Sequence, residues 1–227
     1  MSYKYACLTI GILASLTLAT SCENDGYDTG DGALSYMRAD FVEAYTNADA
    51  LVEYVITDDD DRLTLDSPLE VSWMTEPNAV YRALLYYDMS DELIDPISIS
   101  SVSTPAISLE ADLDEKPTDP LYWNSSWISS NGRYINLGLT LLIGAEDGTI
   151  GTQTLGMMCT DVKYAADSTL TVCLTLLHDQ CDVPEYYSYR HYLSIPISYM
   201  PCDVNEGDTV ELTVNTYSGE ETKAFAL

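Results

Sequence analysis

The chain has 227 residues, with 37 acidic and 9 basic side chains and a formal net charge of −28. So negative a chain repels phosphate groups, which argues against nucleic-acid partners and against electrostatic docking on anionic lipid. Hydrophobic residues make up 46% of the sequence, which is ample for a packed core.

The N-terminal 21 residues are predicted to be a signal peptide. Lys4 gives the start of the chain a positive charge, and residues 8–18 form an apolar run of 11 residues. Such a run is too short to span roughly 30 Å of hydrocarbon, which takes about 20 helical residues, but it is typical of an export signal. The chain is therefore expected to be exported.

Cys22 is the predicted lipidation site. Residues 19–21 are small and lead directly to it, as in the lipobox of bacterial lipoproteins, although Ala19 stands where Leu is more common. The thiol supplies the nucleophile for a thioether to diacylglycerol, and stable anchoring takes more than one acyl chain. This hypothesis makes the membrane a partner through an N-terminal lipid anchor. The alternative is an ordinary secretory signal with a cysteine nearby.

Residues 22–33 are expected to carry the anchor and a flexible acidic tether. They are rich in Asp and Gly and show no hydrophobic periodicity. An acidic patch here resembles the surface-export signal of Bacteroidetes lipoproteins, which implies an outer-membrane protein facing the periplasm or the cell surface. Asp25, Asp28 and Asp31 suggest calcium as an alternative, but the alternate ligands and closing Glu of an EF-hand loop are missing.

After residue 33 the hydrophobic period is two, which predicts strands rather than helices. In the clearest case, Ile135, Leu137 and Leu139 alternate with polar or small residues. Pro196 places its strand at an edge or a bulge, because proline cannot donate to a sheet ladder. The predicted strands cover residues 36–45, 51–56, 69–73, 80–87, 97–101, 135–143, 170–176, 193–197, 210–214 and 223–227.

The strands divide into two groups at about residue 92. The strands before this point suit a small barrel, and the larger number after it suits a sandwich. The sequence therefore predicts an all-β protein with a small N-terminal barrel at residues 34–92 and a C-terminal antiparallel β-sandwich at residues 93–227.

Four cysteines remain beyond the signal and the anchor, and an exported chain permits them to form disulfides. A turn expected near residue 166 would place Cys159 opposite Cys173 in a hairpin. Cys181 and Cys202 would then bracket a Tyr-rich segment. We therefore predict Cys159–Cys173 and Cys181–Cys202 bonds, with four free thiols as the alternative.

The order of several short motifs resembles the NigD-like lipoproteins of Bacteroidetes. That resemblance implies a lipobox, an acidic tether, an OB-like N-terminal barrel and a C-terminal β-sandwich. The family name comes from a bacteriocin gene cluster, and the family offers no catalytic residues or cofactor to transfer. Asp60 and Asp61 depart from the family, which has Gly in this turn. The matching residues are 56–59 with Leu63, 80–87, 119–121 with Trp127, 133–137 and 174–179.

No catalytic motif stands out in the sequence, so no catalytic residue is predicted and the chain is not expected to be an enzyme. The patterns of serine hydrolases, P-loops and dinucleotide-binding folds are missing. His178 beside Asp179 suggests a His–Asp dyad, but no nucleophile is placed near it, and hydrogen bonding at a turn is the favoured interpretation. With two histidines and no CxxC motif, no metal site is expected.

Two aromatic segments are candidate binding surfaces. Tyr122, Trp123 and Trp127 could stack on sugar rings, but the two tryptophans are four residues apart, hence on one face of an extended chain, and such a pair is more often core. Tyr187, Tyr189 and Arg190 lie in a second segment, and exposed Tyr and Arg are typical of protein interfaces. The expected function is thus a non-catalytic envelope lipoprotein that binds a protein, with a surface glycan-binding lipoprotein as the alternative.

Overall fold

The computed structural model describes residues 37–90, 93–146, 149–166 and 168–227, all within one unit of the chain, Tyr36–Leu227. The predicted signal peptide, lipidation site and tether lie outside these residues. The described part is all-β, with two short 3₁₀ helices, Glu110–Asp112 and Ile197–Tyr199. None of its helices is long and apolar enough to cross a membrane.

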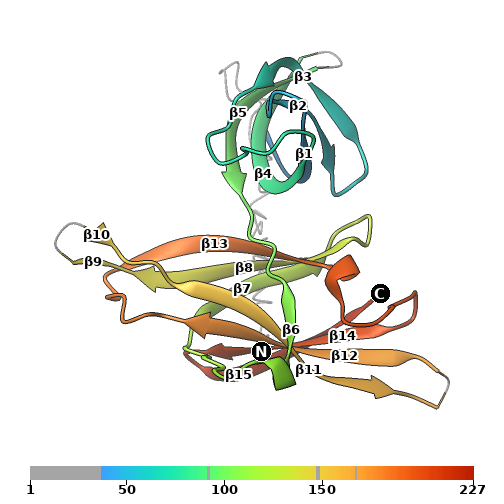
Figure 1. Cartoon of the computed structure of the whole chain (residues 1–227), viewed down its shortest axis with the longest axis vertical. Coiled ribbons are helices and arrows are strands. Elements are labelled where there is room, and N and C mark those ends of the chain that lie inside the picture. Colours follow the sequence, from blue (N-terminus) through green and yellow to red (C-terminus); the bar gives the residue numbers. More distant parts are fainter. Residues whose placement is uncertain (1–36, 91–92, 147–148, 167) are drawn as a thin grey trace, which may run out of the picture. The chain divides into compact units, whose positions relative to one another are not determined.

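Five strands close into a barrel in the order β1-β2-β3-β5-β4 (Figure 1). All neighbouring pairs are antiparallel except β3 with β5. A closed five-stranded sheet with this connectivity is OB-like, so the predicted barrel is confirmed. Its strands are β1 (Met37–Thr46), β2 (Val52–Thr57), β3 (Arg62–Leu69), β4 (Val80–Ser90) and β5 (Leu93–Ser101).

The extent of the barrel differs from the prediction. Because β5 supplies the fifth strand, the barrel continues past the expected boundary at residue 92 and ends at Ser101. The strand expected at residues 69–73 is also wrong, since β3 ends at Leu69. The amide of Met74 instead donates to the carbonyl of Val71 at 2.9 Å, and both side chains pack into the barrel core. The apolar alternation there belongs to a loop that closes the core.

The C-terminal part is a β-sandwich, as predicted. One sheet has the order β15-β14-β12-β11-β6 and the other β13-β8-β7 (Figure 1). Most pairs are antiparallel, but β11 with β6 and β12 with β14 are parallel. The strands of these two sheets are β6 (Ile107–Leu109), β7 (Tyr122–Ile128), β8 (Tyr134–Ile143), β11 (Thr154–Tyr164), β12 (Leu170–Asp179), β13 (Tyr187–Pro196), β14 (Thr209–Thr216) and β15 (Gly219–Ala226). A separate two-stranded sheet consists of β9 (Ala145–Glu146) and β10 (Thr149–Ile150).

The three-stranded sheet has two different faces. Successive side chains of a strand point to opposite faces. In β8, Ile135 and Leu137 are fully buried in the sandwich core, where they meet side chains of the five-stranded sheet. Asn136, between them, hydrogen-bonds to Arg82 of the barrel. One face of this sheet therefore covers the sandwich core, and the other faces the barrel.

Candidate functional site

A buried charged network joins the barrel to the sandwich. Arg82 of β4 holds Asp58, in the turn after β2, through Nη1–Oδ1 and Nη2–Oδ2 contacts of 2.7 and 2.8 Å. Arg82 also donates to Oδ1 of Asn136 and to Oγ of Ser194, each at 3.1 Å. The Asn136 amide donates back to Asp58 at 3.0 Å. Because only 2% of the Arg82 side chain is exposed and its charge is paired, the network is structural.

Motif residues of the NigD-like resemblance meet in this network. Asp58 comes from the first motif, Arg82 from the second and Asn136 from the motif at residues 133–137. They are far apart in sequence, and each supplies a hydrogen bond that another needs. Those motifs therefore describe how the barrel docks on the sandwich, and they do not describe a reaction centre.

Glu43 of β1 forms a second contact of this kind. Its Oε1 accepts from the Tyr134 hydroxyl at 2.7 Å. Its Oε2 accepts from Arg133 at 3.1 Å and from the Tyr45 hydroxyl at 3.0 Å. Burial and the Glu43 carboxylate together raise the pKa of Tyr134 well above its usual value, which keeps the hydroxyl a donor.

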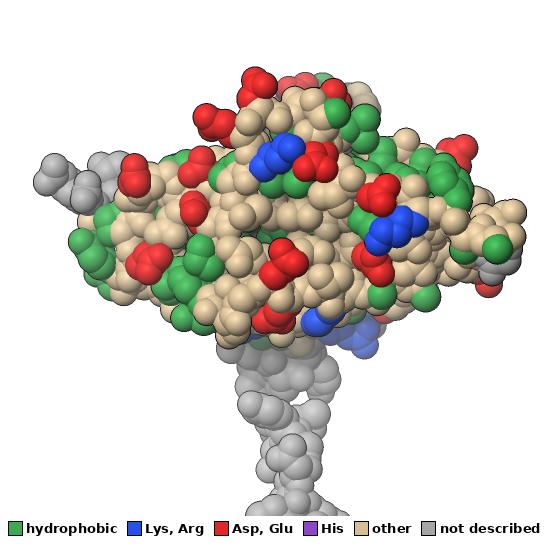
Figure 2. All heavy atoms as spheres, turned by 90° about the horizontal axis from the view of Figure 1, so that it is seen from below, with side chains coloured by type: hydrophobic (Ala, Val, Ile, Leu, Met, Phe, Trp, Pro, Cys, Tyr) green, Lys and Arg blue, Asp and Glu red, His purple; other side chains and the backbone are tan. Residues whose placement is uncertain are grey.

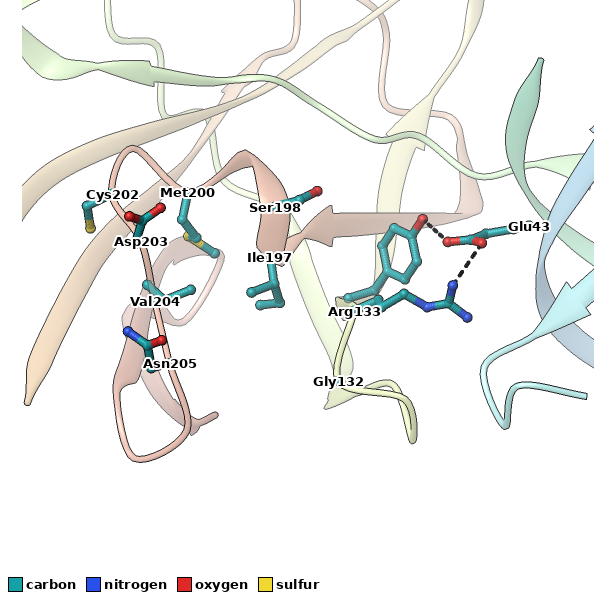
Figure 3. Close-up of a pocket in the computed structure, with 11 residues that line it drawn as sticks. Glu43, Gly132, Arg133, Ile197, Ser198, Met200, Cys202, Asp203, Val204 and Asn205 are labelled. Atoms are coloured by element: carbon teal, nitrogen blue, oxygen red, sulfur yellow. Dashed lines mark hydrogen bonds and ion pairs between the residues drawn. The ribbon is translucent and has the colours of Figure 1, made fainter. Parts of the chain in front are cut away.

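A cavity of about 680 Å³ lies beside this contact (Figure 3). Arg133 and Glu43 form one wall, and the chain after β13, including Met200 and Cys202, forms another. Both oxygens of Glu43 already accept hydrogen bonds, so the carboxylate is not a free base. We assign this cavity no catalytic role.

The His178–Asp179 dyad, the less favoured interpretation of this sequence, does not form. His178 is buried, and its Nδ1 lies 2.9 Å from the carbonyl of Asp119 while Nε2 lies 2.9 Å from Oε1 of Gln153. The Asp179 carboxylate accepts from the amide of Cys181. His178 thus has the hydrogen-bonding role that we favoured. Across the described ranges, no group of three or more His, Cys, Asp or Glu side chains could hold a metal ion.

Trp123 and Trp127 lie on opposite faces of the sheet, contrary to the prediction. A bulge between Trp123 and Ser125 shifts the register of β7 by one residue, and this reverses the face of every later side chain. Trp123 packs against the sandwich core. Trp127 meets the ring of Phe41 in the barrel edge-on, with 5.4 Å between centroids. Tyr122 is 45% exposed and lies 4.7 Å from the ring of Tyr217.

The predicted Cys159–Cys173 and Cys181–Cys202 bonds are not formed in the structure, where all four cysteines are free thiols. A bulge in β11 places Cys159 opposite Leu174, and Cys159 belongs to the sandwich core with it. Cys173, the neighbour of Leu174, points to the other face, where it contacts Glu211. The two thiols therefore lie on opposite faces of one sheet. Cys181 is exposed, whereas Cys202 packs against the core.

The Tyr-rich segment lies on β13, which is an edge strand, as the position of Pro196 predicted. In the sheet β13-β8-β7, the described strands pair with β13 on the β8 side only. Tyr187 is 67% exposed and Tyr189 is 51% exposed, and Arg190 is exposed beside them. Tyr189 and Arg190 point to opposite faces because they are consecutive in a strand.

A cavity of about 640 Å³ lies beside this edge. Leu141, Ile143 and Leu155 provide an apolar floor, while Tyr189 and His191 of β13 provide one wall. We call this cavity, which Ser103, Thr104, Pro105, Gly151, Thr152 and Gln153 also line, the β13 groove. Burial lowers the pKa of His191, which favours the neutral imidazole. The groove is therefore mostly apolar and carries little charge of its own.

Ser103 and His191 are in contact across the groove, with 3.1 Å between Oγ and Nε2. This is the first half of a nucleophile and base pair. A hydrolase needs a third group that orients the base, and among the described residues no carboxylate hydrogen-bonds to His191. We therefore assign this contact between two lining residues of the groove no catalytic role. Sequence periodicity could not find Ser103, because it precedes β6 by a loop and reaches β13 only in the folded chain.

Comparison with solved structures places the fold among proteins of Bacteroides and Parabacteroides. No protein-family model and no curated protein sequence matches the chain. Solved structures do match. One is a NigD-like immunity protein from Bacteroides caccae, with a TM-score of 0.62 and 22% identity over 83% of this chain and 96% of that one.

Two further structures have the same architecture. A protein from Parabacteroides distasonis described as toxin-related has a TM-score of 0.62 and 21% identity, over 84% of this chain and 93% of that one. A protein from Bacteroides fragilis described as a lipoprotein has a TM-score of 0.55 and 12% identity, over 83% and 96%. At these identities the likeness establishes the fold. The NigD-like architecture expected from the sequence motifs is thus confirmed.

Proposed function

We propose that this protein is a non-catalytic, lipid-anchored envelope protein that binds another protein through the edge of β13. The observation that carries the proposal is the exposure of Tyr187, Tyr189 and Arg190 on a strand whose outer side, among the described residues, pairs only through the bridge between Leu193 and Ser103. Tyr and Arg are the residues that interfaces favour, because each combines a large contact area with hydrogen bonds. The immunity and toxin-related neighbours support a role in protein binding.

The lipid anchor is supported by the lipobox-like sequence before Cys22 and by the fold shared with a protein described as a lipoprotein. A Cys22→Ala variant should lose radiolabelled palmitate in the producing bacterium and should move from the membrane fraction to the soluble fraction. Wild-type membrane association without any label on Cys22 would contradict the anchor. Fractionation of the outer membrane would then test the location.

Photo-crosslinking tests the binding surface directly. We would replace Tyr189 with p-benzoylphenylalanine and irradiate living cells. The matched control is Tyr164, which is 73% exposed but lies at the end of β11. We expect a discrete adduct with one envelope protein from position 189 and none from position 164. No adduct from 189, or the same adducts from both positions, would reject the β13 surface.

A second candidate function, glycan binding, is favoured by one observation. Tyr122 and Tyr217 form an exposed pair of rings, with exposures of 45% and 39%, and exposed aromatic rings can stack on sugars. Trp123 and Trp127 no longer support it, since both are half-buried, Trp123 against the sandwich core and Trp127 against Phe41 of the barrel. Loss of retention in a polysaccharide affinity gel on Tyr122→Ala, with unchanged thermal unfolding, would favour this candidate over protein binding.

A further inference from the structure

We propose that the β13 groove is the place of a missing strand, which an extended, basic segment of the partner protein supplies by pairing with Ser188 and Arg190. The inference rests on the proposed protein-binding function and names its mode. Strand addition of this kind uses main-chain hydrogen bonds for affinity and a side-chain pocket for specificity.

The backbone of β13 presents outward main-chain groups that pair with no other strand in the described part of the chain. In an antiparallel pair, alternate residues bond to the neighbouring strand. The amide of Ile197 donates to the carbonyl of Arg133, so odd-numbered residues here bond to β8. The main-chain groups of even-numbered residues point away from β8. The amide of Ser194 donates to the carbonyl of Ser103, and the carbonyl of Tyr192 accepts from the amide of Ser103. The same alternation turns the main-chain groups of Ser188 and Arg190 to the open side.

The chain itself shows that this edge accepts a strand. Ser103 forms a single parallel bridge with Leu193, on the side of β13 opposite to β8. Among the described residues, Ser103 alone bridges to this edge before the segment continues to Thr104 and Pro105 at the groove. The positions of β13 from Tyr187 to His191 pair with no other described strand on this side.

The two sheets leave room for the side chains of an added strand. The sheet with β13 has three strands, whereas the sheet facing it has five. The groove lies where the smaller sheet stops, and Leu155 of the larger sheet forms part of its floor. A residue of the added strand that points to the core side would enter about 640 Å³ of mostly apolar space. An apolar or aromatic side chain of the partner fits that space.

Charge decides what kind of segment would be bound. The chain carries −28, and acidic side chains are spread over the face seen in Figure 2 with few Lys or Arg among them. A second copy of this chain would bring the same net negative charge to the edge. Like charges across a shared edge oppose pairing. A basic segment is attracted instead, so the partner strand should carry Lys or Arg around its apolar residue.

A proline substitution tests the pairing without disturbing the sheet. Ser188→Pro removes an amide that faces away from β8, and edge strands tolerate proline at such positions. Ser188→Ala is the matched control, because it removes the same hydroxyl and keeps the amide. Both variants should have the same thermal unfolding midpoint. If the midpoint of Ser188→Pro alone is shifted, the pairing is tested with an N-methylated peptide instead. The methyl group removes a main-chain hydrogen bond from the partner's side.

The probe is a phage library of random twelve-residue peptides, panned on the full chain in detergent. We expect enriched peptides with one apolar residue flanked by Lys or Arg. The synthetic peptide should bind Ser188→Ala like the wild type and Ser188→Pro at least about tenfold more weakly, since a main-chain hydrogen bond is lost and the proline ring obstructs the edge. Replacing the apolar peptide residue by Ala should also weaken binding.

Other outcomes overturn the inference. Enriched peptides that bind Ser188→Pro unchanged, or no enrichment, would exclude strand addition. A dimer in sedimentation that Ser188→Pro dissolves would assign the edge to a second copy instead. The Tyr189 crosslink distinguishes failure of the proposed protein-binding function from failure of the strand-addition mode. An adduct that persists in Ser188→Pro keeps the binding function and rejects its mode, whereas no adduct rejects the function itself.

Discussion

Arg82 of the barrel donates from Nη2 to Oδ1 of Asn136 in the sandwich at 3.1 Å, and both residues are buried. The contact lies inside a network in which Asp58 neutralises the guanidinium and accepts from the Asn136 amide. Each residue of the network hydrogen-bonds to another, so removing one leaves a buried polar group without its hydrogen-bond partner. The barrel and the sandwich therefore depend on each other at this contact.

Arg82→Met should destabilise the protein by about 3 kcal/mol, because it leaves the Asp58 carboxylate uncompensated. Urea unfolding followed by tryptophan fluorescence measures the change. Lys116→Met is the control, since Lys116 pairs with Glu110 at an exposed site and should cost no more than about 0.5 kcal/mol. Equal changes in the free energy of unfolding would show that the buried network stabilises the protein no more than an exposed ion pair does.

Tyr87 should make stability fall at alkaline pH. Burial, and then its 2.7 Å hydrogen bond to Asp40, raise the pKa of Tyr87 to about 12. The unfolded tyrosine ionises near pH 10, so the unfolded state gains from ionisation first. The contribution of Tyr87 to the free energy of unfolding is thus fully present below pH 10 and is lost as the pH rises toward 12. Urea unfolding between pH 9 and 12 should show a smaller decline in Tyr87→Phe, and an identical decline would contradict the assignment.

Trp123 should tolerate replacement by Phe better than its size suggests. Its Nε1 is buried without a hydrogen-bond partner, so the indole N–H adds a desolvation cost. We expect Trp123→Phe to change the free energy of unfolding by less than about 1.5 kcal/mol, whereas Trp123→Ala should cost about 3 kcal/mol or more. Chemical denaturation compares the two. If both variants remain as stable as the wild type, the ring is not part of the core.

Gly138 should be replaceable only together with its neighbour. A Cβ at Gly138 would lie 2.5 Å from Oγ of Ser125. Gly138→Ala should therefore lower the thermal midpoint, and a second change, Ser125→Ala, should restore most of it. Gly144→Ala is the comparison, because its Cβ would clash with the main-chain oxygen of Pro184, which no side-chain change removes. Failure of the Ser125 change to rescue Gly138→Ala would contradict the packing.

The thiols should alkylate in the order of their exposure. Cys181 is exposed and should react with iodoacetamide first. Cys159 should react last in the native protein, since it is buried and burial raises the pKa of its thiol. Mass spectrometry without a reducing agent would follow both sites. A peptide pair linked through Cys159 and Cys173 would contradict their placement on opposite faces.

The sequence by itself determined the class of the fold and most of its strands. The two-residue period appears in a strand whenever one face of its sheet is more buried than the other, because successive side chains point to opposite faces. It also placed Pro196 on an edge and put Tyr187, Tyr189 and Arg190 on the surface. The export signal and Cys22 are likewise features of local sequence, and they remain predictions.

The faces of several side chains, the contact between barrel and sandwich, and the β13 groove depend on tertiary structure, and the local sequence pattern could not predict them. One bulge in β7 separates Trp123 from Trp127, and another in β11 leaves Cys159 opposite Leu174, because a shift of one residue reverses the face of every side chain beyond it. Arg82 and Asn136 are 54 positions apart, and only the docking of barrel on sandwich reveals that each completes the other. The β13 groove exists for the same reason, since Ser103 reaches the edge of β13 only when the chain leaves the barrel and crosses to the sandwich.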